Sequence, residues 1–247
     1  MALRAFAAGA LFGEAGGSGP PRVLALHGWA RRHADFAGVL QGLDYLALDL
    51  PGFGASPPPA GAMGAREYAE LVEPVLSEMG PNPVIVGHSF GGRVGLVLAS
   101  RHRQVRGLVL AGVPLLAKAR KPPPLRYRLG RLAHRYRLLS DPALERLRQR
   151  YGSSDYRAAS GVMRQVLVRV VNESYEAELQ NLEVPVHLIW GEDDREVPLE
   201  VASRALDLLH RHGGTAVLEV VPGAGHLLPL EAPEALRRAI MLTLELV

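Results

Sequence analysis

The chain has 247 residues, of which 48% are hydrophobic and 21% are charged, and its formal net charge is +3. These values are typical of a soluble globular protein with one large domain and room for an inserted segment. The chain contains no cysteine, which excludes disulfides, thiolate nucleophiles and cysteine-ligated metals, and it contains no run of 18 apolar residues, so we expect no transmembrane helix.

The first predicted elements lie in the N-terminal stretch MALRAFAAGALFGEAGG. It contains one arginine, and Glu14 interrupts its apolar residues early. We therefore expect opening strands, closed by the glycine-rich turn at 16–20, rather than a signal peptide. A cytoplasmic protein is the corresponding expectation.

Short apolar runs then alternate with helical patterns. The runs are 22–26, 45–50, 83–87, 107–111, 185–190 and 216–221, and the helical patterns are 66–79 (with Pro74 at a predicted kink), 90–100, 199–211 and 233–246. This alternation indicates a mostly parallel sheet covered by helices on both faces. With right-handed crossovers it predicts a doubly wound α/β fold.

Residues 115–183 interrupt this alternation. They contain no good strand run, and they show helical spacing in 126–150 and 156–172. We predict a core of residues 1–114 and 184–247 with a helical lid at 115–183. Ligands in such folds bind beyond the carboxyl ends of the strands, where this insertion would cover them.

Basic residues are concentrated in the same segment. Residues 115–150 hold eleven Lys/Arg against Asp141 and Glu145, a net charge of +9, so the rest of the chain carries −6. We interpret this as a solvated helical face, and the alternative is a surface that steers an acidic partner. A further, non-enzymatic alternative is a nucleic-acid or anionic-membrane patch, but no nucleic-acid motif accompanies it.

The stretch VIVGHSFGGRVG, residues 84–95, places Ser89 between a strand run and a helical pattern. A serine at a sharp strand-to-helix turn adopts a strained backbone, and the flanking Gly87 and Gly91 leave room for that turn. The pattern alone is not specific. A nucleophilic serine also needs a base, an acid that orients the base, and donors for an oxyanion.

His226 is the predicted base, because it follows the last strand run in the loop PGAGH at a strand's carboxyl end. The orienting acid is expected in the loop GEDDREVP after the fifth run. Glu192, Asp193 and Asp194 compete for this role, and spacing alone leaves the choice open. For the oxyanion we predict the backbone N–H groups of Phe90, directly after Ser89, and of Trp29, in the loop after the first long run.

Five ordered motifs together resemble those of the α/β-hydrolase superfamily. They are His27-Gly28-Trp29, Asp49-Leu50-Pro51-Gly52-Phe53-Gly54-Ala55-Ser56, Gly87-His88-Ser89-Phe90-Gly91-Gly92, Trp190-Gly191-Glu192-Asp193-Asp194-Arg195 and Gly223-Ala224-Gly225-His226. The resemblance implies that the acid is Asp194, with Asp193 the fallback. The superfamily's dehalogenases and epoxide hydrolases have an aspartate where this chain has Ser89, which argues against both.

The resemblance implies a carboxylic ester hydrolase with a Ser89–His226–Asp194 triad and an acyl-enzyme intermediate. It implies no metal or organic cofactor, and the expected partner is a small-molecule ester, without nucleic acid or membrane. Two enzymatic alternatives remain. The His27 and Asp49 motifs are similar to those of pimeloyl-acyl-carrier-protein methyl ester esterases, which implies an acidic carrier protein at the basic lid, and C–C bond hydrolases share the same triad. A binding or receptor protein on this fold is the non-enzymatic alternative, which a complete triad disfavours.

Overall fold

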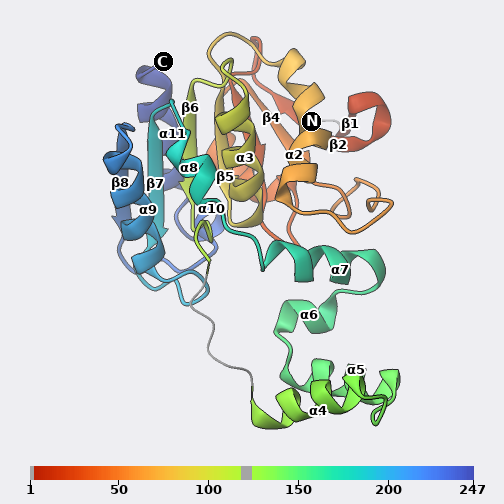
Figure 1. The fold of residues 1–247 in the computed structure, drawn as a ribbon. Helices are drawn as coiled ribbons and strands as arrows, with labels where there is room; N and C mark the ends of the chain where they lie inside the picture. Colours follow the sequence, from red (N-terminus) through yellow and green to blue (C-terminus); the bar gives the residue numbers. More distant parts are fainter. Residues whose placement is uncertain (1–2, 118–123) are drawn as a thin grey trace.

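The computed structural model describes residues 3–117 and 124–247. Its centre is an eight-stranded sheet with the order β1-β2-β4-β3-β5-β6-β7-β8 (Figure 1). Neighbouring strands from β4 to β8 in this order pair in parallel, whereas β2 is antiparallel to β1 and β4. The predicted mostly parallel, doubly wound α/β fold is confirmed.

Each of the six predicted apolar runs coincides with a strand to within one residue at either end. The strands are β1 (Leu3–Phe6), β2 (Leu11–Gly16), β3 (Val23–Leu26), β4 (Tyr45–Asp49), β5 (Val84–His88), β6 (Gly107–Ala111), β7 (Val186–Gly191) and β8 (Ala216–Val221). Every residue of β3 to β7 is buried, because helices cover both faces of these strands. The N-terminal stretch forms β1 and β2, as predicted.

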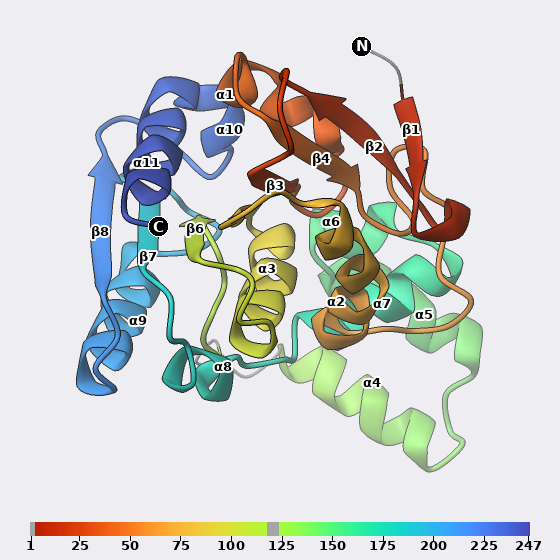
Figure 2. The same ribbon diagram turned by 90° about the horizontal axis from the view of Figure 1, so that it is seen from above.

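Two helical layers cover the sheet (Figure 2). One contains α1 (Ala37–Leu40), α10 (Leu228–Glu231) and α11 (Pro233–Glu245), and the other contains α2 (Ala65–Val72), α3 (Phe90–Arg101), α8 (Glu176–Gln180) and α9 (Leu199–Arg211). Alternate strand residues serve the two layers, so that Leu24 and Leu26 of β3 belong to the core with α3, and Val23 and Ala25 to the core with α11.

The predicted helix at 66–79 divides at its proline. The α-helix α2 ends at Val72, and the chain continues to Glu78 as the 3-10 helix η3 (Glu73–Glu78). Pro74 has no N–H to donate to a carbonyl four residues earlier, so the α-helical ladder cannot continue through it. Two further 3-10 helices are η1 (Ala7–Gly9) and η2 (His33–Phe36).

Between β6 and β7 the described residues form only helices. They are α4 (Leu125–Arg135), α5 (Asp141–Tyr151), α6 (Ser154–Ala158), α7 (Gly161–Val170) and α8. Helices α4 and α5 lie farthest from the sheet (Figure 1), whereas α8 packs against α3 and α9. The division of the chain at 115–183 into a separate lid stays a prediction. Of the basic residues in this segment, Lys118, Arg120 and Lys121 lie outside the described residues.

In the part of the chain that the structure describes, no helix has the length and apolarity needed to span a bilayer.

Asp49, the last residue of β4, holds the loop of the second motif. Its side chain is 1% exposed. One carboxylate oxygen accepts the His33 backbone N–H at 2.8 Å and lies 2.8 Å from His33 Nδ1, and the other accepts the Ala55 N–H at 2.8 Å. Burial acts to raise the pKa of Asp49, but these hydrogen bonds outweigh it and hold the pKa below its ordinary value.

We therefore expect Asp49→Ala to lower the free energy of unfolding by about 2–4 kcal/mol, because it leaves buried donors without an acceptor. Urea unfolding measures this change, with exposed Asp207→Ala as the control, expected within about 0.5 kcal/mol of wild type. Since the pKa of Asp49 is depressed in the folded state, its contribution is present above the unfolded pKa of about 3.9 and is lost as pH falls below it. A destabilisation that is equal at pH 7 and pH 3 would contradict this role.

Candidate active site

Ser89 lies at the turn between β5 and α3. Its backbone has φ 48° and ψ −110°, a conformation that side-chain-bearing residues rarely adopt. The Ser89 N–H donates to the Ala111 carbonyl at the end of β6, at 2.9 Å. This turn is the strained elbow that the sequence predicts, and it presents the serine at the carboxyl edge of the sheet.

The glycines around Ser89 are required by close backbone contacts. A β-carbon at Gly87 would lie 2.4 Å from the Gly92 α-carbon, and one at Gly91 would lie 2.2 Å from the Leu26 carbonyl oxygen. Both distances are far below any van der Waals contact. Helix α3 therefore begins directly against β3 and β5, and only glycine permits this approach.

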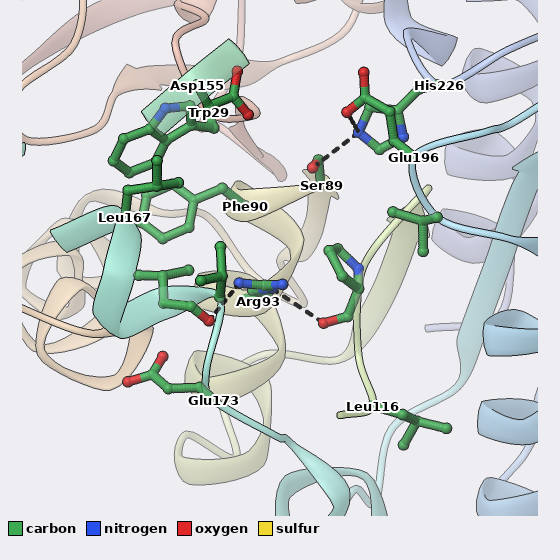
Figure 3. Close-up of a pocket in the computed structure, with 14 residues that line it drawn as sticks. Trp29, Ser89, Phe90, Arg93, Leu116, Asp155, Leu167, Glu173, Glu196 and His226 are labelled. Carbon is green, nitrogen blue, oxygen red and sulfur yellow. Dashed lines mark hydrogen bonds and ion pairs between the residues drawn. The ribbon is translucent and has the colours of Figure 1, made fainter. Parts of the chain in front are cut away.

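The structure brings Ser89, His226 and Asp194 together in a chain of hydrogen bonds. His226 Nε2 lies 3.0 Å from Ser89 Oγ, and His226 Nδ1 lies 2.8 Å from Asp194 Oδ2 (Figure 3 shows the contact with Ser89). A carboxylate only accepts hydrogen bonds, so Nδ1 carries the proton of the neutral ring and Nε2 accepts from the serine hydroxyl.

Asp194, and neither Asp193 nor Glu192, contacts the histidine. Its side chain is fully buried, and its second oxygen accepts the N–H groups of Glu196 and Val197 at 2.9 and 2.8 Å. Asp193 is exposed and lies in the turn, where its N–H donates to the Ala224 carbonyl. The same carboxylate that orients His226 thus also shapes the loop after β7.

The loop that carries Trp29 passes next to Ser89. A β-carbon on Gly28 would lie 3.4 Å from Ser89 Cβ, so the Gly28–Trp29 peptide and the Phe90 N–H at the start of α3 flank the serine. The Trp29 ring packs edge to face against Phe53 and Phe90, with ring centres 4.9 and 5.7 Å apart. Side-chain packing and the predicted use of the backbone N–H are therefore compatible.

His27 fixes the orientation of that peptide. Burial lowers the pKa of His27 to about 4, so the ring is neutral at pH 7. The Leu50 N–H donates to Nε2 at 2.9 Å, and Nδ1 therefore carries the proton and donates to the Gly28 carbonyl at 2.7 Å. That carbonyl and the Trp29 N–H belong to the same peptide group.

His88 supports the loop of His226. The sequence predicts that it points away from Ser89. In the structure its Nε2 donates to the His226 carbonyl at 2.8 Å, and its ring centre is 5.0 Å from that of His226. Burial, and then the neighbouring His226, lower the pKa of His88 to about 3, so it is neutral. Its position at the end of a buried strand was the signal for such a role.

A pocket of about 160 Å³ opens at Ser89 and His226 (Figure 3). Its walls combine core and inserted residues, namely Trp29, Phe90, Arg93, Pro114, Leu116, Asp155, Leu167, Val170, Val171, Glu173, Glu196 and Val197. Oε2 of Glu196 lies 3.5 Å from His226 Nε2. Because Leu167 and Val170 belong to α7, this helix supplies much of the apolar wall facing the serine.

Arg93 is a pocket residue that the sequence did not single out. It lies on α3, one turn after Ser89, and it is 7% exposed. Its Nε donates to the Pro114 carbonyl at 3.1 Å and its Nη1 to the Val170 carbonyl at 2.8 Å (Figure 3). One guanidinium thus joins the helix after the serine to the end of α7.

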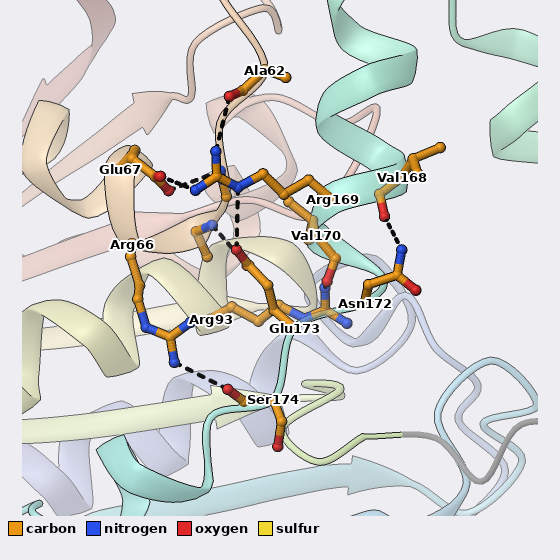
Figure 4. A network of polar contacts seen from close by, with 12 residues as sticks. Ala62, Arg66, Glu67, Arg93, Val168, Arg169, Val170, Asn172, Glu173 and Ser174 are labelled. Carbon is orange, nitrogen blue, oxygen red and sulfur yellow. Dashed lines mark hydrogen bonds and ion pairs between the residues drawn. The ribbon is translucent and has the colours of Figure 1, made fainter.

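A polar network fastens α7 to α2 (Figure 4). Arg169 forms an ion pair with Glu67 and donates to the Ala62 carbonyl at 3.1 Å. Glu173 accepts the Ala65 N–H at 3.0 Å and the Tyr175 hydroxyl at 2.5 Å. These contacts fasten the end of α7 to the core helix α2, and Arg164 of α7 separately contacts Glu145 of α5 at 2.7 Å.

No group of three or more potential metal ligands occurs within residues 3–117 and 124–247. The groups that meet at the pocket are instead a hydroxyl, an imidazole and a carboxylate in series. Such a series can remove the hydroxyl proton as the oxygen attacks an electrophilic carbon.

Comparisons with known proteins agree with this fold. The model of the alpha/beta hydrolase family matches residues 23–239. The chain is 27% identical over 248 residues to the uncharacterized hydrolase YugF of Bacillus subtilis (strain 168), a match that covers 90% of this chain and 89% of the relative. It is 28% identical over 214 residues to a 2-hydroxy-6-oxononadienedioate/2-hydroxy-6-oxononatrienedioate hydrolase of Pseudomonas sp, covering 77% and 73%.

The crystal structure of a serine hydrolase involved in carbazole degradation, the CarC enzyme, is similar with a TM-score of 0.73 and 24% identity, covering 100% of this chain and 99% of that one. This likeness shows the shared fold. The family match over most of the chain shows that the chain belongs to the α/β-hydrolase family and is a hydrolase.

The elbow geometry predicts unequal effects of two glycine substitutions on α3. Gly91→Ala places a methyl group against a backbone oxygen, and we expect a loss of more than about 3 kcal/mol of stability or no soluble protein. At Gly95 a β-carbon would meet side chains rather than backbone, Ile85 at 2.9 Å and Leu108 and Leu26 at 3.7 and 3.8 Å, and these can shift, so Gly95→Ala should cost about 1 kcal/mol or less. Urea unfolding of both variants compares them, and similar midpoints would contradict the assigned role of Gly91.

Proposed function

We propose that the protein is a carboxylic ester hydrolase in which Ser89 is the nucleophile, His226 the general base and Asp194 the residue that orients and stabilises His226. The observation that carries the proposal is the continuous hydrogen-bond chain of 3.0 and 2.8 Å through the two histidine nitrogens. A serine hydroxyl is a poor nucleophile near neutral pH and needs this arrangement to react.

In the first half of the reaction, Ser89 Oγ attacks the acyl carbonyl carbon while its proton moves to His226 Nε2. The negative charge that develops on the carbonyl oxygen is stabilised by the N–H groups of Trp29 and Phe90. As the tetrahedral intermediate collapses, the proton on Nε2 passes to the departing alkoxide, and the alcohol leaves. Asp194 stabilises the imidazolium ion during this step without taking its proton.

In the second half, a water molecule takes the place of the alcohol. His226 Nε2 accepts a proton from the water as the hydroxide attacks the acyl-enzyme, and then returns that proton to Ser89 Oγ as the carboxylic acid is released. His27 contributes indirectly in both halves, because it orients the peptide that bears the Trp29 donor.

The pocket favours a small acyl group. Its volume of about 160 Å³ lies below the range of pockets that bind drug-sized ligands, and its wall near the serine contains Leu167, Val170 and Val171. We propose short-chain esters as substrates. We also propose that α6 and α7 act as the predicted lid, since both contribute residues to the pocket.

A second candidate reaction is the hydrolysis of a C–C bond in an anionic diketo-type substrate. It is favoured by the similarity to a 2-hydroxy-6-oxononadienedioate hydrolase and by the guanidinium of Arg93 in the pocket, which suits a carboxylate group. Turnover of a 2-hydroxy-6-oxodienoate without turnover of any ester would favour this reaction. An acyl-carrier-protein-bound methyl ester stays a prediction from the motifs.

Hydrolysis of p-nitrophenyl esters of increasing acyl length tests the leading proposal. We expect turnover of acetyl and butyryl esters that falls steeply for long chains, because the pocket is small. Ser89→Ala should lower kcat by about three or more orders of magnitude with the fold intact. Near wild-type turnover by this variant would exclude Ser89 as the nucleophile.

Two neighbouring aspartates provide a matched pair of variants. Asp194→Asn should lower kcat by about three orders of magnitude, because an amide stabilises neither the required tautomer nor the imidazolium. Asp193→Asn removes an exposed carboxylate and should stay within about twofold of wild type. Steady-state kinetics on a short-chain ester measures both, and the reverse order of effects would assign the role to Asp193.

A further inference from the structure

Helix α4 carries an apolar stripe that faces solvent. Leu125, Leu129, Leu132 and Tyr136 follow one another at intervals of four, three and four residues, and so share one side of the helix. They are 66%, 55%, 50% and 66% exposed. The next residue but one, Leu138, is 81% exposed. In an ordinary surface helix this stripe would face the protein core.

The opposite side of α4 makes its contacts with α5. The Tyr127 ring packs edge to face on Tyr151 of α5, with centres 6.2 Å apart, and His134 Nε2 lies 2.6 Å from Asp141 Oδ1. Because polar and aromatic residues face α5, the leucine stripe points away from the protein. Its orientation is therefore fixed by specific contacts.

Arginines border the stripe. Arg126, Arg128 and Arg135 lie on its two sides, Arg131 lies nearer the side that faces α5, and all four are exposed. Residues 124–151 contain eight arginines and two acidic residues, a net charge of +6. Both acids are already engaged, Asp141 by His134 and Glu145 by Arg164 and Arg148. Within the described residues, none of the four arginines of α4 forms an ion pair, so the stripe lies beside positive charge that is not neutralised there.

This combination selects among occupants of the stripe. A second copy of α4 would bring one strongly positive surface against another, which is unfavourable. A helix with leucine and tyrosine on one side and arginine at its borders is suited to lie in the boundary between lipid headgroups and acyl chains. Each arginine near an anionic lipid surface strengthens binding several-fold.

We propose that α4 is a docking helix for anionic phospholipid surfaces, with the leucine stripe in the headgroup–acyl boundary and the bordering arginines on headgroup phosphates. This replaces the expectation that no membrane is a partner. Helices α4 and α5 project from the molecule (Figure 1), and the pocket residues Asp155 and Leu167 follow α5 in the chain. Docking would therefore hold the inserted segment that lines the pocket at the lipid surface.

Vesicle co-sedimentation in about 0.1 M salt tests the proposal with two lipid compositions, phosphatidylcholine alone and phosphatidylcholine mixed with phosphatidylglycerol. We expect binding to the anionic vesicles and little to the neutral ones. The variant R126Q/R128Q/R131Q/R135Q should bind at least about 100-fold more weakly. The control R103Q/R106Q/R204Q/R211Q removes the same charge from exposed arginines outside α4 and should bind within a few-fold of wild type.

A second pair of variants separates the stripe from the charge. L125S/L129S/L132S should weaken vesicle binding at least about tenfold. The control L230S/L242S/L246S removes leucines of similar exposure in α10, in α11 and directly after α11, and it should not weaken binding. Unchanged thermal unfolding and unchanged turnover of a soluble ester show that these variants fold.

Because the chain contains no cysteine, a single introduced cysteine can be labelled specifically to probe insertion of α4 into the lipid. Leu132→Cys labelled with an environment-sensitive dye should shift to the blue on anionic vesicles, and the label on Arg204→Cys should not. Equal binding to both vesicle types, equal losses in the arginine variant and its control, or an unshifted label at position 132 would overturn the proposal. So would retention on immobilised polyglutamate without vesicle binding, which would assign the stripe to an acidic protein partner.

Discussion

The backbone of Ser89 is the constraint on which the rest of the site depends. A non-glycine residue in such a conformation costs of order 1–3 kcal/mol and persists only where its surroundings enforce it. The hydrogen bond to Ala111 ties the turn to β6, and the contact of Gly91 with Leu26 places α3 directly on β3. The strain is therefore held by the pairing of the central strands. The sheet itself therefore fixes the orientation of Ser89, and no flexible loop is needed to position it.

Two buried histidines then set the loops on either side of the serine. His27 holds the peptide of Trp29, and His88 holds the backbone of His226. Their pKa values of about 4 and about 3 keep both rings neutral at ordinary pH, so each has one donor and one acceptor nitrogen. In consequence the two loops keep the same hydrogen bonds through the neutral pH range. Of the three histidines His27, His88 and His226, only His226 faces the pocket.

The sheet was predictable because its signal is local, and the remainder depends on contacts distant in sequence. Buried parallel strands are continuous apolar runs, and Pro74 ends the α-helical part of 66–79 because a proline in a helix interior has no N–H for the ladder. By contrast, adjacent residues Asp193 and Asp194 differ only in where the turn directs them. The helical pattern at 126–150 splits into α4 and α5 because Arg137 adopts φ 60°, a position where glycine would have given the stop signal. Helical spacing at 126–150 likewise predicts a helix without revealing which of its sides faces solvent.

The pocket wall and the groups of the proposed catalytic series come from different stretches of the chain. Leu167, Val170 and Val171 belong to α7 and its end, which is anchored to α2 through Arg169 and Glu67, whereas Ser89, Asp194 and His226 follow strands of the sheet. A substitution in α7 therefore changes the size and shape of the space above the serine without altering the hydrogen bonds among Ser89, His226 and Asp194. Substrate range and reaction chemistry can consequently diverge separately among descendants of this sequence.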